Sequence, residues 1–163
     1  MSGGNPADRE GGAEVADATI PGPAEPGDAS PPPPRGLLDT TIFIARESGR
    51  PVDVSRLPEE SAVSVITIAE LHAGVLAAAD TDIRARRLAT LESVADIQAL
   101  PVDDAAARVW ARMRVHLAQS GRRVRVNDLW IAAVAAANQL PVVTQDDDFD
   151  SVRGVAGLAV IKV

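Results

Sequence analysis

The chain contains no cysteine and no tyrosine, and aromatic residues make up only 2% of its 163 residues. The lack of cysteine excludes disulfides and thiolate metal sites, which leaves carboxylates and two histidines as metal ligands. The scarcity of aromatic rings argues against the base-stacking platforms of single-strand-binding proteins. If the protein acts on a nucleic acid, we expect recognition to depend on the backbone and the shape of a folded RNA.

Long apolar runs are missing as well. No run approaches the roughly 18 residues of a membrane span, and the N-terminus has no apolar stretch like that of a secretory signal. We therefore expect no membrane partner and a cytoplasmic location. Lysine is almost absent, because every basic residue except Lys162 is an arginine. The planar guanidinium suits bidentate contact with phosphate, although a GC-rich coding bias explains this preference equally well.

Proline and glycine divide the chain into two parts. Residues 1–35 hold eight of the twelve prolines and six of the twelve glycines, together with six acidic residues. Without apolar periodicity, such a segment cannot bury enough surface to offset its ordering entropy. We predict a disordered, acidic Pro/Gly/Ala-rich tail over residues 1–35 and one folded domain over residues 36–163. A start of translation further downstream is the alternative explanation of the tail.

Within residues 36–163, short apolar or β-branched runs alternate with longer helical patterns. The expected strands are residues 37–39, 62–66, 98–102, 141–144 and 158–161. The expected helices are residues 41–47, 67–79, 82–95, 103–121 and 128–140. This alternation predicts an α/β fold, a three-layer sandwich with a central, mostly parallel twisted sheet of four to five strands flanked by helices. Ligands of such sheets bind beyond the carboxyl ends of the strands.

Four acidic residues lie where the expected strands end or the expected helices begin: Asp39, Glu70, Asp128 and Asp146. Short connections would bring all four to the same edge of a parallel sheet. Two unit charges about 5 Å apart repel by roughly 3 kcal/mol at an effective dielectric constant near 20. Four carboxylates in one pocket would therefore protonate, separate or bind a cation. Their chemistry favours a divalent-metal site that holds Mg²⁺ or Mn²⁺.

Each of these acids, taken alone, also fits a helix cap or a turn. Thr67 and Glu70 have the spacing of a capping box. Asp39 and Asp128 lie at expected helix starts, where carboxylates cap free amides. Asp146 is also suited to the first position of a turn. The convergence of all four on one edge favours the metal site over four independent caps.

The segments that carry these acids, LLDTT, ITIAELHAG, VNDLWIAA and VVTQDDDF, resemble those of the PIN-domain ribonucleases in order and spacing. The resemblance is specifically to the VapC-type toxins of bacterial toxin–antitoxin pairs, and it covers residues 36–163. It implies a PIN-like fold and an Mg²⁺-dependent endoribonuclease that hydrolyses RNA, with tRNA or rRNA as the expected target and Mn²⁺ as a substitute metal. It also implies a VapB-type antitoxin as partner and a homodimer.

The resemblance further implies roles for individual residues. Asp39 and Asp128 would be the principal Mg²⁺ ligands. Glu70 and Asp146 would complete the acidic pocket, either by holding a second ion or by orienting the attacking water. The fourth position departs from the family pattern, because residues 146–148 offer three aspartates and Asp148 is an alternative or additional candidate for the role of Asp146. The pocket would be lined by two hydroxyl side chains, Thr40 and Thr144. The long proline-rich N-terminus departs from the family pattern.

Arginines precede the third acidic segment. Arg122, Arg123 and Arg125 fit either a phosphate clamp for the RNA backbone or a solvated loop that caps the carbonyls of the preceding helix. Other basic, histidine and tryptophan side chains have ordinary structural explanations. Exposed helix faces are expected for Arg84, Arg86, Arg87, Arg112 and Arg114, ordinary surface or core positions for His72 and His116, and core positions for Trp110 and Trp130. Residues 73–77 suit either the core or a dimer interface.

Three other interpretations of the sequence compete with that of a nuclease. A phosphoacceptor receiver module would need an acidic pair after the first strand and a lysine near the site, whereas Asp39 stands alone and Lys162 is near the chain end. A phosphatase of the haloacid-dehalogenase type would need an Asp-x-Asp motif at the same place. A non-catalytic PIN-like scaffold that binds RNA retains all four acids and is the stronger alternative.

Overall fold

The computed structural model describes residues 31–163, which form a single α/β unit. The strands are β1 (Arg35–Leu38), β2 (Glu60–Ser64), β3 (Gln98–Leu100), β4 (Val142–Thr144) and β5 (Val160–Lys162). The α-helices are α1 (Thr40–Ser48), α2 (Val65–Leu76), α3 (Thr81–Glu92), α4 (Asp104–Ser120) and α5 (Val126–Ala137). Short 3-10 turns are η1 (Val54–Arg56), η2 (Asp147–Val152) and η3 (Val155–Gly157).

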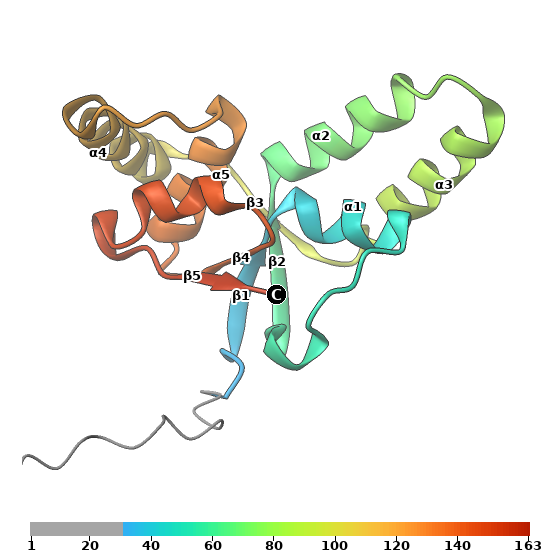
Figure 1. Ribbon diagram of the computed structural model, residues 1–163, viewed down its shortest axis with the longest axis horizontal. Helices are drawn as coiled ribbons and strands as arrows, with labels where there is room; N and C mark the ends of the chain where they lie inside the picture. Colours follow the sequence, from blue (N-terminus) through green and yellow to red (C-terminus); the bar gives the residue numbers. More distant parts are fainter. Residues whose placement is uncertain (1–30) are drawn as a thin grey trace, which may run out of the picture. The chain divides into compact units, whose positions relative to one another are not determined.

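All five strands are parallel and lie in the order β3-β2-β1-β4-β5. Helices α1, α2 and α3 lie on one side of this sheet, and α4 and α5 lie on the other (Figure 1). The predicted three-layer α/β sandwich is therefore confirmed, with a sheet that is entirely rather than mostly parallel. Because β1 occupies the centre and β4 is its neighbour, the loops that follow these two strands lie side by side.

Alternation along the central strands divides the apolar core in two. Leu37 and Val142 face the cluster that contains α4 and α5 residues. Their chain neighbours Leu38 and Val143 face the second cluster, which includes Phe43 of α1. Successive side chains of a strand point to opposite faces, so a sheet buried on both sides needs such continuous apolar runs. The core fixes the register of β1 and β4, and with it the position of the residues that follow them.

The Asp103 cap of α4 is confirmed, as is its end at Gly121, which adopts a left-handed conformation with φ 66°. Helices α2 and α5 begin two residues earlier than predicted, and the predicted strand 62–66 is wrong at its end, because residues 65–66 already belong to α2. The capping-box alternative for Thr67 and Glu70 is wrong. Helix α2 begins earlier, and Ser64 caps it by accepting a hydrogen bond from the Thr67 backbone N–H at 3.0 Å. Glu70 is therefore one turn inside the helix and is free of any capping role.

The predicted tail covers residues 1–35, of which residues 1–30 lie outside the described part. Arg35 is already the first residue of β1 and pairs with Glu60 of β2. The Glu60 backbone N–H also bonds the Pro34 carbonyl at 2.9 Å, so ordered pairing extends to the end of the proline run. In residues 31–163, no helix is long and apolar enough to cross a membrane.

The two tryptophans stack on each other at a centroid distance of 5.0 Å and an angle of 19°. Trp110 of α4 and Trp130 of α5 are both half-buried and pack against the margin of the core, rather than at its centre. Both His72 and His116 are exposed, in keeping with ordinary surface positions.

Candidate metal centre and its cavity

A cavity of about 270 Å³ opens at the carboxyl edge of the sheet. The acidic side chains predicted to converge there do so, because Asp39, Glu70, Asp128 and Asp146 all line it. Its remaining wall comes from α1, α2, α3 and the loop before α5. These residues are Thr40, Thr41, Ile44, Glu47, Leu71, Gly74, Arg87 and Arg125. Five segments that are far apart in the sequence thus share one pocket.

Asp39 follows β1 directly and is almost completely buried. Its Oδ2 accepts hydrogen bonds from the hydroxyls of Thr41 at 2.6 Å and Thr144 at 2.8 Å. Burial raises the pKa of Asp39 above its ordinary value, and these hydrogen bonds oppose the rise. The Thr144 hydroxyl in turn accepts the backbone N–H of Asp146 at 2.9 Å. The threonines therefore join the ends of β1 and β4 and fix the loop that carries Asp146.

Glu70 is held from two sides. Its carboxylate accepts a short hydrogen bond from the Thr40 hydroxyl, and its Oε1 accepts one from the Asn127 side-chain amide at 2.8 Å. The first contact comes from α1 and the second from α5. Because Asn127 directly precedes Asp128, this bond fixes α2 against the start of α5. Thr40 thus lines the cavity as expected, whereas Thr144 supports it through Asp39.

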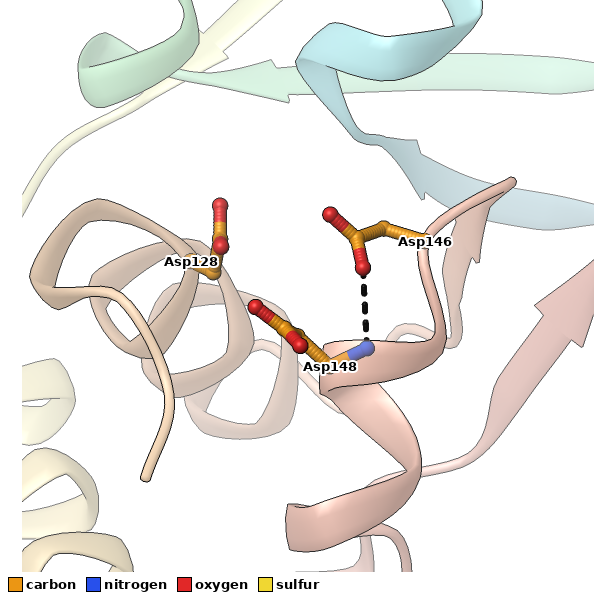
Figure 2. Close-up of side chains that lie close together, drawn as sticks. All are labelled: Asp128, Asp146 and Asp148. Atoms are coloured by element: carbon orange, nitrogen blue, oxygen red, sulfur yellow. Dashed lines mark hydrogen bonds between the residues drawn. The ribbon is translucent and has the colours of Figure 1, made fainter.

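The tightest acidic grouping among the described residues consists of Asp128, Asp146 and Asp148. Each offers a carboxylate oxygen, and these oxygens lie within 4.8 Å of one another. Figure 2 shows the three side chains gathered between the start of α5 and η2. Asp146 caps η2 by accepting the Asp148 backbone N–H at 2.9 Å, which leaves its other oxygen toward the group. Both candidates for the fourth acid, Asp146 and Asp148, therefore belong to the cluster.

The Asp128 carboxylate is the least satisfied of the group. Its Oδ2 is buried and has no hydrogen-bond partner in the described part of the chain. Burial and then the nearby charge of Asp39 raise the pKa of Asp128 from 3.8 to about 7. A buried anionic oxygen is costly unless a cation or a donor meets it. A hard divalent cation with a preference for carboxylate oxygens fits this unpaired atom and its two acidic neighbours.

A guanidinium faces the same three carboxylates. Arg125 nitrogens lie 3.9 Å from Asp128, 3.7 Å from Asp146 and 3.8 Å from Asp148. These distances are too long for hydrogen bonds, so the interaction is Coulombic. The Arg125 side chain is 74% exposed and makes all three contacts from the solvent side. It lowers the pKa of Asp128 and partly offsets the charge of the cluster.

The structure separates the three arginines that the sequence placed together. Arg125 lines the acidic cavity, whereas Arg122 and Arg123 line a second hollow beside α4. The prediction that Arg87 belongs to an exposed helix face is wrong, because this side chain is half-buried and lines the acidic cavity. Its Nη1 bonds the Gly74 carbonyl at 2.6 Å.

Sequence reasoning also missed two polar residues of this site, Glu47 and Asn127. Glu47 lies at the far wall of the cavity, where its carboxylate is 3.8 Å from Arg87. No local pattern marks it, because the contact depends on how α1 and α3 pack. Asn127 has a visible signal in the sequence, since it adjoins Asp128 in a segment that the acids already mark.

Comparison with known proteins places this geometry in a family. A model of the PIN domain matches residues 36–155. Ribonuclease VapC5 of Mycobacterium tuberculosis is 65% identical to this chain, and the match covers 80% of this chain and 97% of the relative. Ribonuclease VapC4 of that organism is 38% identical, and the match covers 74% of this chain and 93% of the relative. The crystal structure of the VapBC-5 toxin–antitoxin system of M. tuberculosis matches with a TM-score of 0.75 and 62% identity, over 80% of this chain and 100% of that chain. A DNA-bound VapBC complex of Salmonella typhimurium matches at a TM-score of 0.63 and 27% identity, over 78% and 97%.

The chain therefore belongs to the PIN-domain family. Within that family it belongs to the VapC group, as its similarity to VapC5 over most of the chain shows. The resemblance that the four acidic segments suggested is confirmed.

Proposed function

We propose that this VapC-type protein is an endoribonuclease toxin that hydrolyses RNA phosphodiester bonds with Mg²⁺ at the acidic cavity, with tRNA or rRNA as target. Mn²⁺ is expected to replace Mg²⁺. The observation that carries the proposal is the buried, unpartnered Oδ2 of Asp128 beside two further carboxylates. A structural cap would satisfy such an atom with a backbone amide, whereas this oxygen lies beside other carboxylates and has only the exposed Arg125 guanidinium near it, at 3.9 Å.

We assign the principal metal contacts to Asp39 and Asp128, with Asp146 and Asp148 as further ligands. A divalent cation bound there would lower the pKa of a water molecule and offset the charge that develops on the phosphate. The threonine hydroxyls on Asp39 leave it oriented before any ion arrives, because its rotamer is fixed from two elements. This preorganisation reduces the entropy lost when the site is assembled.

Glu70 or Asp146 would position the attacking water and accept its proton. Glu70 lines the cavity and is held by Thr40 and Asn127, so its carboxylate has a fixed direction. Asp146 has one oxygen engaged as a helix cap and the other available. A general base must lie within hydrogen-bond reach of the proton that it abstracts, and both residues line the cavity where that water would stand.

Substrate contact would begin at Arg125. Its guanidinium faces the carboxylates from the mouth of the cavity, where an RNA phosphate would have to enter. Once a metal offsets the acidic charge, the arginine would be free to turn to the phosphate. Arginine forms paired hydrogen bonds with phosphate oxygens, which would help to orient the scissile group.

The test is incubation of the purified protein with total RNA in Mg²⁺, in Mn²⁺ and in EDTA, followed by mapping of the fragment ends. We expect a small set of discrete cuts with either metal and none with EDTA. Asp128→Asn should abolish cutting while it preserves the fold. Cutting that persists in EDTA or in the Asp128→Asn variant would place the chemistry elsewhere.

We further propose a VapB-type antitoxin partner, which the similarity to toxin–antitoxin complexes supports. An antitoxin arginine would enter the acidic cavity and compete with the metal. A homodimer through α2 is also proposed, since Leu76 is 83% exposed there. Light scattering of Leu76→Glu against the parent chain tests the dimer. The cytoplasm is the proposed location.

A further inference from the structure

A second hollow, of about 530 Å³, lies beside the start of α5. It is enclosed by the C-terminal half of α4, the loop 121–125 and the first residues of α5. Three of its lining residues are arginines, Arg114, Arg122 and Arg123, and no lining residue is acidic. The rest of the wall is small or apolar. It consists of Leu117, Ala118, Gly121, Val124, Val126 and Leu129.

The charge of this hollow is not compensated within residues 31–163. None of the three guanidinium groups takes part in an ion pair or a side-chain hydrogen bond there. Several other arginines of the domain are paired, and Arg108, for instance, contacts Asp104 one turn away on α4. Arg50, Arg56 and Arg112 are also unpaired in the described residues, but they line neither cavity. Three like charges around one concave surface attract anions and repel each other until an anion arrives.

The hollow adjoins the acidic cavity. Arg125 belongs to the wall of the acidic cavity, and the next residue, Val126, belongs to the wall of the hollow. The backbone at these two residues therefore forms the ridge between a negative and a positive concave surface. Val126 is 63% exposed on that ridge.

We propose that the hollow of Arg114, Arg122 and Arg123 is a subsite for the backbone phosphates of the RNA strand that is cut in the acidic cavity. This inference rests on the proposed function and adds the path of the strand. The acidic cavity repels phosphate until it holds a cation, so the attraction that brings RNA to it has to come from another surface. The nearby basic hollow supplies that attraction. The low aromatic content agrees with a backbone contact, since stacking on bases would require rings that the hollow lacks.

The subsite should determine the affinity for RNA rather than the rate of the cleavage step. It lies across the ridge from the acids, so its arginines would hold the flanking strand without touching the reacting atoms. Phosphate contacts of this kind are independent of base sequence and depend steeply on salt. Substrate binding and its salt slope are therefore the sensitive quantities.

The experiment measures RNA binding by fluorescence anisotropy over a series of salt concentrations, with a labelled single-stranded RNA. Asp128→Asn is the parent, so that the RNA stays intact. In this parent, Arg114, Arg122 and Arg123 are changed together to alanine. The matched control changes the same number of exposed arginines that line neither cavity and make no ion pair in the described residues: Arg50, Arg56 and Arg112. Equal midpoints of urea unfolding establish that both variants are folded. If a triple variant does not fold, the corresponding single-residue variants replace it.

We expect the hollow variant to bind RNA at least about tenfold more weakly at moderate salt, with a logarithmic salt slope shallower by about 2, as the loss of three phosphate contacts predicts. The control variant should change little. With Asp128 intact, the hollow variant should raise KM for RNA cleavage and leave kcat near that of the parent.

Equal affinity of the hollow and control variants for RNA would overturn the proposal. So would a hollow variant that binds RNA normally and loses affinity only for an acidic peptide or the antitoxin, since the hollow would then be a protein-docking site. Absence of RNA cleavage by the unaltered chain would instead count against the proposed function, while the binding comparison would still decide whether the hollow contacts RNA.

Discussion

The Thr144 hydroxyl donates a hydrogen bond to Asp39 Oδ2 at 2.8 Å, across 105 positions of sequence. Thr144 ends β4 and Asp39 follows β1, so the bond joins the carboxyl ends of two neighbouring parallel strands. Both residues are buried. The bond therefore orients a buried acidic side chain, opposes the rise in the pKa of Asp39 that burial causes, and links the fold to the proposed metal centre.

Thr144→Val should reduce both stability and activity. Valine keeps the shape of threonine but removes the donor, so the Asp39 carboxylate loses a buried, charge-assisted hydrogen bond worth about 1.5–3 kcal/mol. The pKa of Asp39 should rise further, because that bond now lowers it. Urea unfolding measures the loss of stability, and the cleavage rate as a function of pH should shift its acidic limb upward. Thr144→Ser keeps the hydroxyl and should retain most of both; a valine variant indistinguishable from the parent would contradict the role of this bond.

The stability of the metal-free protein should fall as the pH rises toward 8. Burial and the charge of Asp39 raise the pKa of Asp128 from 3.8 to about 7, so the folded state holds this proton more tightly than the unfolded state. The contribution to stability is complete below pH 3.8 and is lost as the pH rises through about 7. Asp128→Asn removes this penalty and should be more stable than the parent at pH 8 by roughly 1–4 kcal/mol.

Chemical denaturation of EDTA-treated protein at several pH values tests this expectation. The difference between the parent and Asp128→Asn should be small near pH 4 and grow up to pH 8. Added Mn²⁺ should stabilise the parent and leave Asp128→Asn nearly unchanged. A constant difference at all pH values would mean that Asp128 keeps an ordinary pKa.

Arg125→Ala should strengthen metal binding and weaken RNA binding. The guanidinium offsets the charge of Asp128, Asp146 and Asp148 from 3.7 to 3.9 Å, and a metal ion has to compete with it. Because Arg125 is largely exposed, its removal should tighten Mn²⁺ binding only about 2- to 5-fold, within the range of solvent-screened ion pairs.

Calorimetric titration with Mn²⁺ measures this change, and Arg112→Ala, which removes an exposed charge that does not line the acidic cavity, provides the control. If Arg125→Ala leaves Mn²⁺ affinity unchanged, the arginine and the metal occupy separate positions. If it weakens Mn²⁺ binding, Arg125 positions the ligands instead of competing for them.

Ser64→Ala should destabilise the domain without abolishing cleavage. Its hydroxyl caps α2 through the Thr67 backbone N–H, and loss of an N-cap costs about 1 kcal/mol. The thermal midpoint should fall by a few degrees, while kcat at a temperature well below the midpoint should stay near the parent value. Loss of activity in a folded Ser64→Ala protein would show that α2 needs this cap to hold Glu70 in place.

The sheet and the convergence of the acids follow from local patterns in the sequence. Continuous apolar runs such as the one before Asp39 predict strands buried on both faces, and strand–helix alternation predicts their parallel order. These two facts suffice to bring Asp39 and Asp146 to the same edge. The chemistry of converging carboxylates adds the expectation of a divalent metal, and the family resemblance adds that of RNA cleavage.

Side-chain partners could not be predicted in the same way, because they depend on packing between distant elements. The Ser64 cap was missed since Thr67 and Glu70 have the spacing of a capping box three residues later. The cavity position of Arg87 depends on how α3 folds back on α2, which periodicity does not specify. Arg125 lines the acidic cavity while its neighbours Arg122 and Arg123 line the hollow, because the loop that carries them runs between the two cavities. Local sequence patterns do not specify the path of this loop.

The most direct test of the central claim is a crystal structure of the protein grown with Mn²⁺, with anomalous scattering used to locate the ion. We predict a peak within direct coordination distance (about 2 Å) of oxygens of Asp39 and Asp128 and beside Asp146 and Asp148, with Arg125 displaced from the carboxylates that it now faces. A peak elsewhere, or no peak in a protein that still cleaves RNA, would contradict the account.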